Sequence, residues 1–274
     1  MLLNQEVTLE STATKLRIEI LKMIFEAQSG HPGGSLSAID IMTALYCKVM
    51  KHDPQHPDWP DRDRFILSKG HAAPALYAIL AHCGYFPPEK LNTLRKIGSL
   101  LQGHPEKNKL AGAEASTGSL GQGISIGIGM ALAGRLDGKD YRTYVLVGDG
   151  ETNEGQIWEA ALFAGNHKLD QLVVILDNNG QQLDGSVQEI MPLAPLSDKW
   201  RSFGWNVIEI DGHRMNEILT AFERARSMKG KPTIIIAKTV KGKGVSFMEN
   251  NNEFHGMAPN KEQFSLALQE LEHA

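Results

Sequence analysis

The chain has 274 residues, 42% of them hydrophobic, which is enough for the core of one large α/β domain or of two small ones. A formal charge of −4, with no dense block of lysine and arginine, argues against nucleic-acid binding. The first residues lack the basic and apolar regions of a signal peptide, and no apolar run reaches the ~18 residues that a membrane span needs. Cys47 and Cys83 form no CxxC pair, so a disulfide scaffold or zinc cage is not expected, and a reducing cytoplasm is the simplest setting.

The first half of the chain is predicted to be mainly helical. Apolar residues recur at helical spacing over residues 8–28, and this helix is expected to end in the glycine- and proline-rich run 29–34. A second helix is expected over residues 37–49, with Ser35 or Ser37 as its cap. The segments that follow are a loop over 52–64, a strand over 65–67, a helix up to residue 81, mostly irregular chain over 84–117 and a helix over 120–136.

The helix over 120–136 carries small residues at every fourth position, namely Gly123, Gly127 and Ala131. Small side chains at this spacing are expected to let another helix approach closely. The same segment does not support NAD binding, because Leu132 stands where a dinucleotide-binding fingerprint has its third glycine and no strand precedes it.

The second half alternates between strands and helices. Short apolar runs rich in β-branched residues predict strands over 144–147, 172–176, 206–210 and 233–237, with helices over 155–168 and 214–228. A closing helix is expected to bury Phe264, Leu268 and Leu271. The alternation predicts one α/β domain over residues 1–274, built on a doubly wound, mainly parallel sheet flanked by helices.

Two polar side chains follow neighbouring strands of this predicted sheet. Asp149 lies just past the strand over 144–147, and Asn179 lies just past the strand over 172–176. The carboxyl ends of parallel strands meet at one edge of a sheet, where ligands bind, so both side chains are expected there. Carboxylate and amide oxygens suit Mg²⁺ or Ca²⁺, and Mg²⁺ adds phosphate oxygens to one or two protein ligands. The pattern predicts half of a metal–phosphate site.

Four histidines stand next to a glycine on a predicted loop or strand end: His31, His71, His104 and His255. A single loop histidine is usually an ordinary surface residue, but four in this context favour a role in hydrogen bonding or proton transfer. No HxxxH or CxxC spacing supports zinc as the alternative.

Three charged residues are ambiguous. Glu154 begins the helix over 155–168 and could be a solvated acid that favours the helix dipole. Lys241 and Lys243, in a glycine-rich loop, could meet phosphate or could be solvated.

The motif Gly148-Asp149-Gly150, followed after residues 151–177 by Asn178-Asn179, resembles the signature of thiamine-diphosphate enzymes. Further segments resemble the transketolase family, in the family's order and over nearly the whole chain: Gly30-His31-Pro32-Gly33, Ser68-Lys69-Gly70-His71, Gly103-His104-Pro105-Glu106, Thr117-Gly118-Ser119-Leu120-Gly121-Gln122-Gly123, Glu154-Gly155 and His255-Gly256.

The resemblance implies that the cofactor is thiamine diphosphate held by a divalent metal ion, Mg²⁺ or Ca²⁺. Asp149, Asn179 and the backbone carbonyl of Gln181 would bind the metal, and Gly150 would let the backbone approach the diphosphate. The residues implied to bind the cofactor are His71, Gly118, Ser119, Leu120, Asp149, Gly150, Glu151, Asn179 and His255. Gly118 and Leu120 would contact its aminopyrimidine.

The resemblance also implies which residues take part in catalysis, namely His31, His71, His104, His255 and Glu154. His31, His104 and His255 would line the site and hydrogen-bond the hydroxyls of the sugar, and His71 and His255 would approach the diphosphate or the reacting carbons. Glu154 is similar to the family's acid in a network that links the two active sites of a dimer.

The chain departs from the family in length, because its members are usually more than twice as long. The missing half carries the pyrimidine-binding domain, with the glutamate that activates the cofactor and the arginines that grip sugar phosphate. The resemblance therefore implies the N-terminal subunit of a split transketolase. This subunit is expected to transfer a two-carbon ketol unit between sugar phosphates, as in the pentose phosphate pathway, only in an α2β2 heterotetramer with a separate C-terminal, pyrimidine-domain subunit.

Several alternatives use the same cofactor: a deoxyxylulose-phosphate synthase, a phosphoketolase and a 2-oxo-acid dehydrogenase subunit. The segments Gly-His-Pro-Glu and Leu-Gly-Gln-Gly favour transketolase over the dehydrogenases. A variant that acts on an unusual pentose phosphate also stays open, since sugar selection lies largely in the absent half. A non-catalytic cofactor-binding subunit is disfavoured by the retention of all the site histidines.

Overall fold

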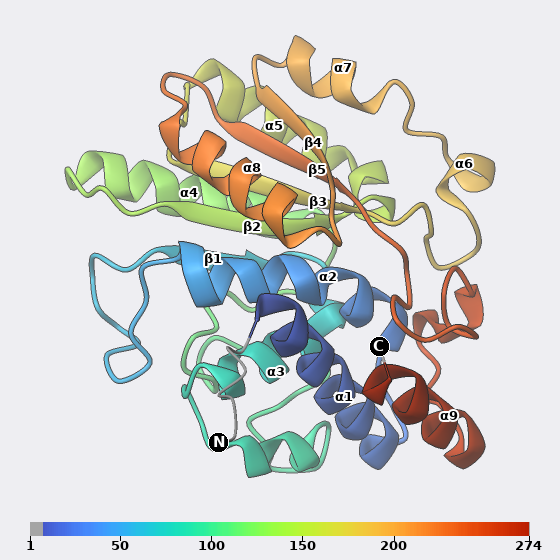
Figure 1. The fold of residues 1–274 in the computed structure, drawn as a ribbon. Helices are drawn as coiled ribbons and strands as arrows, with labels where there is room; N and C mark the ends of the chain where they lie inside the picture. The colour runs from blue at the N-terminus through green and yellow to red at the C-terminus, as the bar shows by residue number, and fades with distance from the viewer. Residues whose placement is uncertain (1–7, 274) are drawn as a thin grey trace, which may run out of the picture.

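The computed structural model describes residues 8–273; residues 1–7, where no signal peptide is predicted, and residue 274 lie outside that range. The described part contains a five-stranded, all-parallel sheet with the strand order β1-β2-β3-β5-β4 (Figure 1). The predicted α/β fold with a parallel sheet is confirmed. The strands are β1 (Arg64–Leu67), β2 (Thr143–Gly148), β3 (Leu172–Asn178), β4 (Asn206–Asp211) and β5 (Thr233–Lys238).

Helices cover both faces of the sheet. The crossovers that run forward along the strand order carry α4 (Gln122–Leu136), α5 (Gly155–Asn166) and α7 (Leu196–Ser202), whereas the backward crossover from β4 to β5 carries α8 (Met215–Ser227). Right-handed crossovers in opposite directions place their helices on opposite faces, as Figure 1 shows for α5 and α8. The other helices are α1 (Leu9–Ala27), α2 (Pro32–Ala44), α3 (Ala73–His82), the short α6 (Val187–Ile190) and α9 (Lys261–Glu272).

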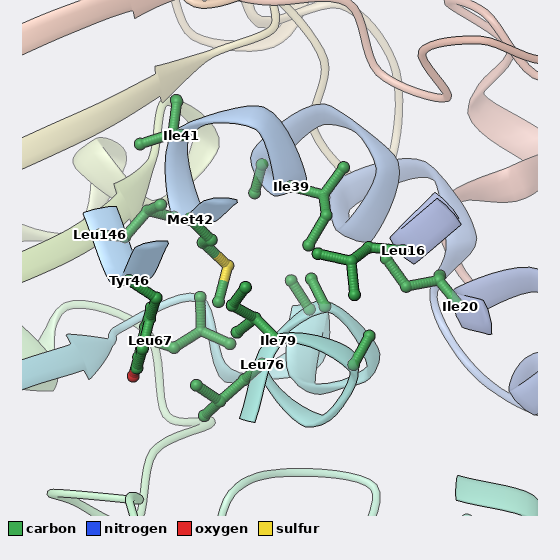
Figure 2. Packing of buried hydrophobic residues seen from close by; sticks show 14 of the residues in the cluster. Leu16, Ile20, Ile39, Ile41, Met42, Tyr46, Leu67, Leu76, Ile79 and Leu146 are labelled. Carbon is green, nitrogen blue, oxygen red and sulfur yellow. The ribbon is translucent and has the colours of Figure 1, made fainter. Parts of the chain in front are cut away.

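Two hydrophobic clusters, one on each face, hold these layers together. Successive residues of a strand point to opposite faces, so Leu146 joins the cluster shared with α1, α2, α3 and α8, whereas Val145 joins the cluster with α4 and α5. Figure 2 shows the first cluster, where side chains from α1, α2 and α3 meet those of β1 and β2. Burial on both faces explains why the strands read as continuous apolar runs.

The second helix begins earlier than the sequence suggests, at Pro32 instead of residue 37. Proline fits the first helical position because its missing N–H would have no partner there, and its fixed φ already suits a helix. His31, not a serine, is the residue before the helix, and Ser35 lies inside it with its hydroxyl donating to the His31 carbonyl at 2.7 Å. The helix then widens into a π-helical turn over Leu45–Val49.

Gly123 and Gly127 of α4 face the sheet and not a second helix. A Cβ on Gly127 would lie 2.5 Å from Val145 Cγ2, and one on Gly123 would lie 2.4 Å from Ser68 Oγ. The expected close approach is therefore real, but the partner is β2 and the segment after β1.

The closing helix α9 buries less than expected. Leu271 is buried as predicted, together with Ala267, whereas Leu268 is only partly buried. Phe264 is also partly buried and stacks on Phe25 of α1 with ring centroids 4.1 Å apart. No helix within residues 8–273 is both long enough and apolar enough to cross a membrane.

Candidate active site

The carboxyl ends of β2 and β3 lie side by side, with Gly148 opposite Asp177 in the register. This arrangement brings Asp149 and Asn179 to one edge of the sheet, as their spacing predicts. A cleft of about 280 Å³ opens there between segments that are distant in the sequence. It is lined by Gly34, Lys69, His71, Leu120, Gly148, Asp149, Gly150, Glu151, Asn153, Glu154, Asn179, Gln181, Gln182, Leu183, Lys241 and His255.

Asp149 is a buried carboxyl group at the base of this cleft, only 1% exposed. Burial, and next the neighbouring Asp177 carboxylate, raise its pKa to about 7. Its oxygens accept hydrogen bonds from the backbone N–H groups of Gly150 (2.8 Å) and Gly180 (2.5 Å), but no lysine, arginine or histidine within residues 8–273 forms an ion pair with it. A buried carboxylate without a cationic partner is costly, so this position suits a bound cation.

The other two expected metal ligands lie beside Asp149. Asn179 Oδ1 accepts a hydrogen bond from the backbone N–H of Gln181 at 3.0 Å, and its Nδ2 donates to Asp177. Within the described range, no cluster of three or more histidine, cysteine, aspartate or glutamate side chains could hold a metal ion. The oxygen set of one carboxylate, one side-chain amide and one backbone carbonyl is of the kind that suits a hard ion such as Mg²⁺, with phosphate and water as further ligands.

Lys69, which lines the cleft, forms a fully buried ion pair with Asp177 that sequence reasoning did not single out. Asp177 also accepts hydrogen bonds from the hydroxyls of Ser37 and Thr239, and these donors and Lys69 outweigh the effect of burial, so its pKa is lowered. The only sequence signal is that Lys69 belongs to the Ser-Lys-Gly-His segment and that Asp177 ends an apolar strand. The pair joins β3 to the segment after β1.

Three of the four predicted histidines form one cluster. The ring centroids of His31, His71 and His255 lie 5.2–5.6 Å apart, although the residues come from three distant segments. Burial and neighbouring cationic groups lower the pKa of His31 to about 4 and that of His255 to about 3, and that of His71 falls well below its usual value. All three are neutral imidazoles at pH 7, and the buried Nδ1 of His31 has no hydrogen-bond partner among residues 8–273.

Lys241 lies beside this histidine cluster and lines the cleft together with His71 and His255. It is 2% exposed, and its ammonium Nζ donates to His255 Nδ1 (2.8 Å) and to Asn252 Oδ1 (3.0 Å). Burial, and next the charge of Lys69, lower its pKa to about 8, so it still carries a charge at pH 7. Because the ammonium can only donate, His255 keeps its own proton on Nε2. Of the two ambiguous lysines, only Lys241 lines the cleft; Lys243 does not.

The fourth histidine, His104, is exposed and lies against Gly118, where a Cβ would come 2.8 Å from its ring. Neither residue lines the cleft. Leu120 does, whereas its neighbour Ser119 is exposed and is not part of the lining. Glu154 is exposed at the rim of the cleft, at the start of α5.

Glu151 has a scaffolding position. Its buried carboxylate accepts hydrogen bonds from the Ser68 hydroxyl and from the backbone N–H groups of Gly121 (2.9 Å) and Gly148 (3.0 Å). It thereby joins three loops that surround the cleft. At the neighbouring Gly150, a Cβ would lie 2.8 Å from Gln182 Cβ, so only glycine allows the loop after β3 to come this close.

Comparisons with known proteins agree with this architecture. The family described as transketolase, thiamine diphosphate binding domain, matches residues 9–272. The chain is 49% identical to the 6-deoxy-6-sulfo-D-fructose transketolase subunit of Clostridium sp. (strain MSTE9), over 98% of both chains. It is 43% identical to one of the apulose-4-phosphate transketolase subunits of Phocaeicola vulgatus (97% of this chain, 95% of that one) and 44% identical to human transketolase (96% and 42%).

Solved structures give the same result. Transketolase from Campylobacter jejuni superposes with a TM-score of 0.92 at 35% identity, over 98% of this chain and 43% of that one. A transketolase variant from Pichia stipitis gives 0.92 at 32% identity, over 96% and 40%. The fold and the site thus define a thiamine-diphosphate-binding domain. The chain belongs to the transketolase family, and it spans less than half the length of these two solved members.

Proposed function

We propose that this chain is the N-terminal, diphosphate-binding subunit of a split transketolase, and that residues 1–274 act as a single domain. The proposal rests on how much of each relative's length the chain covers. It covers 95–98% of the length of relatives named as transketolase subunits, but 42% of the length of human transketolase. A separate pyrimidine-domain subunit would supply the remaining part of the active site. We also propose that two copies of each subunit form an α2β2 assembly in the cytoplasm.

We further propose that the cleft binds thiamine diphosphate through a divalent metal ion, most simply Mg²⁺. Asp149, Asn179 and the Gln181 carbonyl would hold the ion, and Lys241 would add a positive charge for the diphosphate. The uncompensated buried carboxylate of Asp149 supports this assignment. The bound cofactor supplies the electron sink that lets a two-carbon ketol unit be transferred; the residues of this chain bind, orient and shield it.

The histidine cluster would act on the sugar. Neutral His31, His71 and His255 can donate N–H hydrogen bonds to hydroxyl groups without placing further positive charge in the cleft. The low pKa values of His31 and His255 make them weak bases, so they are suited to hydrogen bonding and to moving a proton only as charge develops on the substrate oxygen. His104, outside the cleft, would reach only an extended substrate.

The identity of the sugars is the second question. A ketose phosphate as donor and an aldose phosphate as acceptor are proposed for the reaction. The names of two relatives mention 6-deoxy-6-sulfo-D-fructose and apulose 4-phosphate, which favours the alternative of a variant transketolase for an unusual sugar. A deoxyxylulose-phosphate synthase or 2-oxo-acid dehydrogenase subunit is disfavoured because the named relatives are transketolases.

The proposal is tested by reconstitution. The purified chain, its candidate pyrimidine-domain partner and the mixture of the two are assayed for ketol transfer with thiamine diphosphate and Mg²⁺, over a panel of ketose and aldose phosphates. Activity is expected only in the mixture. Robust transfer by the chain alone would refute the split-enzyme proposal, and the panel identifies the preferred sugars.

A further inference from the structure

Outside the cleft, three side chains form a buried polar network: Arg17 on α1, Asp40 on α2 and His213 after β4. Arg17 Nη2 donates to Asp40 Oδ2 at 2.5 Å, and His213 Nδ1 lies 2.6 Å from the same oxygen. Burial alone would raise the pKa of Asp40, but the hydrogen bond from His213 and the Arg17 charge outweigh it and lower the pKa, so the group is a carboxylate. None of the three lines the cleft.

The network holds the loop Val240–Gly244, here called the Lys241 loop, at two points. The backbone N–H of Val240 donates to His213 Nε2 at 2.8 Å, and Arg17 Nε donates to the Lys243 carbonyl at 3.1 Å. A backbone N–H can only donate, so Nε2 is unprotonated and the proton on Nδ1 is donated to Asp40. The two bonds lie on either side of Lys241 in the chain.

Other contacts fix the backbone between these two points. The N–H of Gly242 donates to the Gly33 carbonyl at 3.0 Å, and the Lys241 carbonyl accepts from Asn250 N–H at 2.9 Å. Gly242 has a positive φ of 80°, and a Cβ there would lie 2.2 Å from the Met248 carbonyl oxygen. The loop therefore has one tightly defined path, which directs the Lys241 side chain toward His255 and the cleft.

We propose that Arg17, Asp40 and His213 are positioning residues that clamp the Lys241 loop and thereby hold the Lys241 ammonium ready for the cofactor's diphosphate. The identity of the ligand rests on the proposed function; the clamp itself does not. A cation that is already in place loses little conformational entropy when the anion binds, so releasing the loop weakens binding without removing any contact to the ligand.

Hydrogen exchange of the full chain, without cofactor, tests the clamp. In His213→Asn the amide N–H group lies near the position of Nδ1 but offers Val240 no acceptor, whereas in His213→Gln the carbonyl oxygen can lie near the position of Nε2. Loss of one buried hydrogen bond is expected to speed exchange over residues 240–244 by about tenfold in the Asn variant, and the Gln variant is expected to restore part of the protection.

Thr43→Ala is the matched control, because Thr43 lies buried on α2 one turn after Asp40 and, in the part of the chain that the structure describes, its hydroxyl bonds only to the Ile39 carbonyl. It should leave exchange over 240–244 unchanged. Equal exchange of this segment in the unsubstituted chain and in His213→Asn would overturn the clamp.

A double-mutant cycle tests whether the clamp acts through Lys241. Calorimetry measures binding of thiamine diphosphate with Mg²⁺ to the assembled enzyme. His213→Asn is expected to weaken binding about tenfold when Lys241 is present and to have no further effect in Lys241→Met. Additive losses would overturn the proposal. Absence of binding by the unsubstituted enzyme would refute the proposed function, and the exchange experiment would still decide whether the loop is clamped.

Discussion

At the scale of single residues, the cleft is defined by charges that are buried without full compensation. Lys69 and Asp177 neutralise each other, whereas Asp149 has only two backbone N–H donors and no cationic partner in the described chain. Lys241 is held among neutral groups, with its pKa lowered to about 8. Within residues 8–273, neither Asp149 nor Lys241 forms an ion pair, and both line the cleft. Such a carboxylate and ammonium suit a metal ion and an anion that bind together.

Asp149 is expected to be essential for the metal. Asp149→Asn keeps the size of the side chain but removes the negative charge, so affinity for thiamine diphosphate with Mg²⁺ should fall by about 100-fold. Calorimetry on the assembled enzyme measures the change. Asp184→Asn, an exposed aspartate in the loop after β3, serves as the control and should bind normally. Unchanged affinity in Asp149→Asn would exclude this metal site.

Lys241 is expected to impose a pH limit on cofactor binding. Its pKa of about 8 means that the ammonium loses its proton as the pH rises through this value, so affinity should begin to fall above pH 8, by up to about tenfold per unit. In the cofactor-free chain, the stability of the fold depends on pH in the opposite direction. Between about pH 8 and the pKa of this lysine in the unfolded chain, the unfolded state binds more protons than the folded state. This lysine therefore contributes stability that rises with pH over that range.

The measurement is a series of calorimetric titrations from pH 7 to pH 9.5, with Lys241→Met as the comparison. The variant should bind more weakly at pH 7 and show a flatter pH dependence above pH 8. The same break at pH 8 in both proteins would assign it to another group.

At the scale of elements, several residues of the candidate site lie at the amino-terminal ends of helices. His31 immediately precedes α2 and His71 precedes α3, so two helices that pack on one another present their amino-terminal ends to the cleft. Glu154 begins α5 on the other side of the sheet. On α4, the glycines do not create a site; they allow the helix to lie close against β2 and to support the strand that ends at Asp149.

Two glycines of α4 are expected to respond in opposite ways to the same substitution. Gly127→Ala places a methyl group 2.5 Å from Val145 Cγ2 and should destabilise the chain by about 1–3 kcal/mol through overpacking. Gly129→Ala meets no atom within 4 Å and should stabilise it by about 0.5–1 kcal/mol, because alanine loses less backbone entropy in a helix. Urea unfolding of the isolated chain measures both. Equal effects would mean that α4 does not pack as described.

At the scale of the whole molecule, the chain forms both faces of its sheet by itself. Within residues 8–273, the two hydrophobic clusters pack helices of this chain against both faces of its own sheet. On the proposal, the glutamate that activates the ring of the cofactor comes from the pyrimidine-domain subunit. On the proposal, a domain with its own hydrophobic core depends on a second subunit for catalysis.

The assembled enzyme is expected to contain two copies of each subunit. Light scattering after size-exclusion chromatography should give a mass equal to two copies of this chain plus two of the pyrimidine-domain subunit, when both are present with thiamine diphosphate and Mg²⁺. A stable complex with one copy of each, carrying full activity, would contradict the α2β2 arrangement.

The sequence by itself determined the parallel α/β sheet, since buried strands must be apolar on both sides and helices alternate with them. It also determined that Asp149 and Asn179 share an edge, because the carboxyl ends of adjacent parallel strands coincide. The predictions for the start of α2 and for the partner of the α4 glycines were wrong. A proline that begins a helix and a proline in a loop before a helix leave the same local pattern. A glycine that faces a strand likewise has the same spacing as a glycine that faces another helix.

Only the tertiary structure decided what lies between distant segments. The Lys69–Asp177 pair spans 108 positions of sequence, and the contact between Asp40 and His213 spans 173. No periodicity reports such pairs, because each partner is an ordinary loop or strand-end residue until the chain is packed. The same holds for the neutral state of the three clustered histidines and for the charge of Lys241: these depend on burial and on nearby charges, which are properties of the folded chain and not of the residues alone.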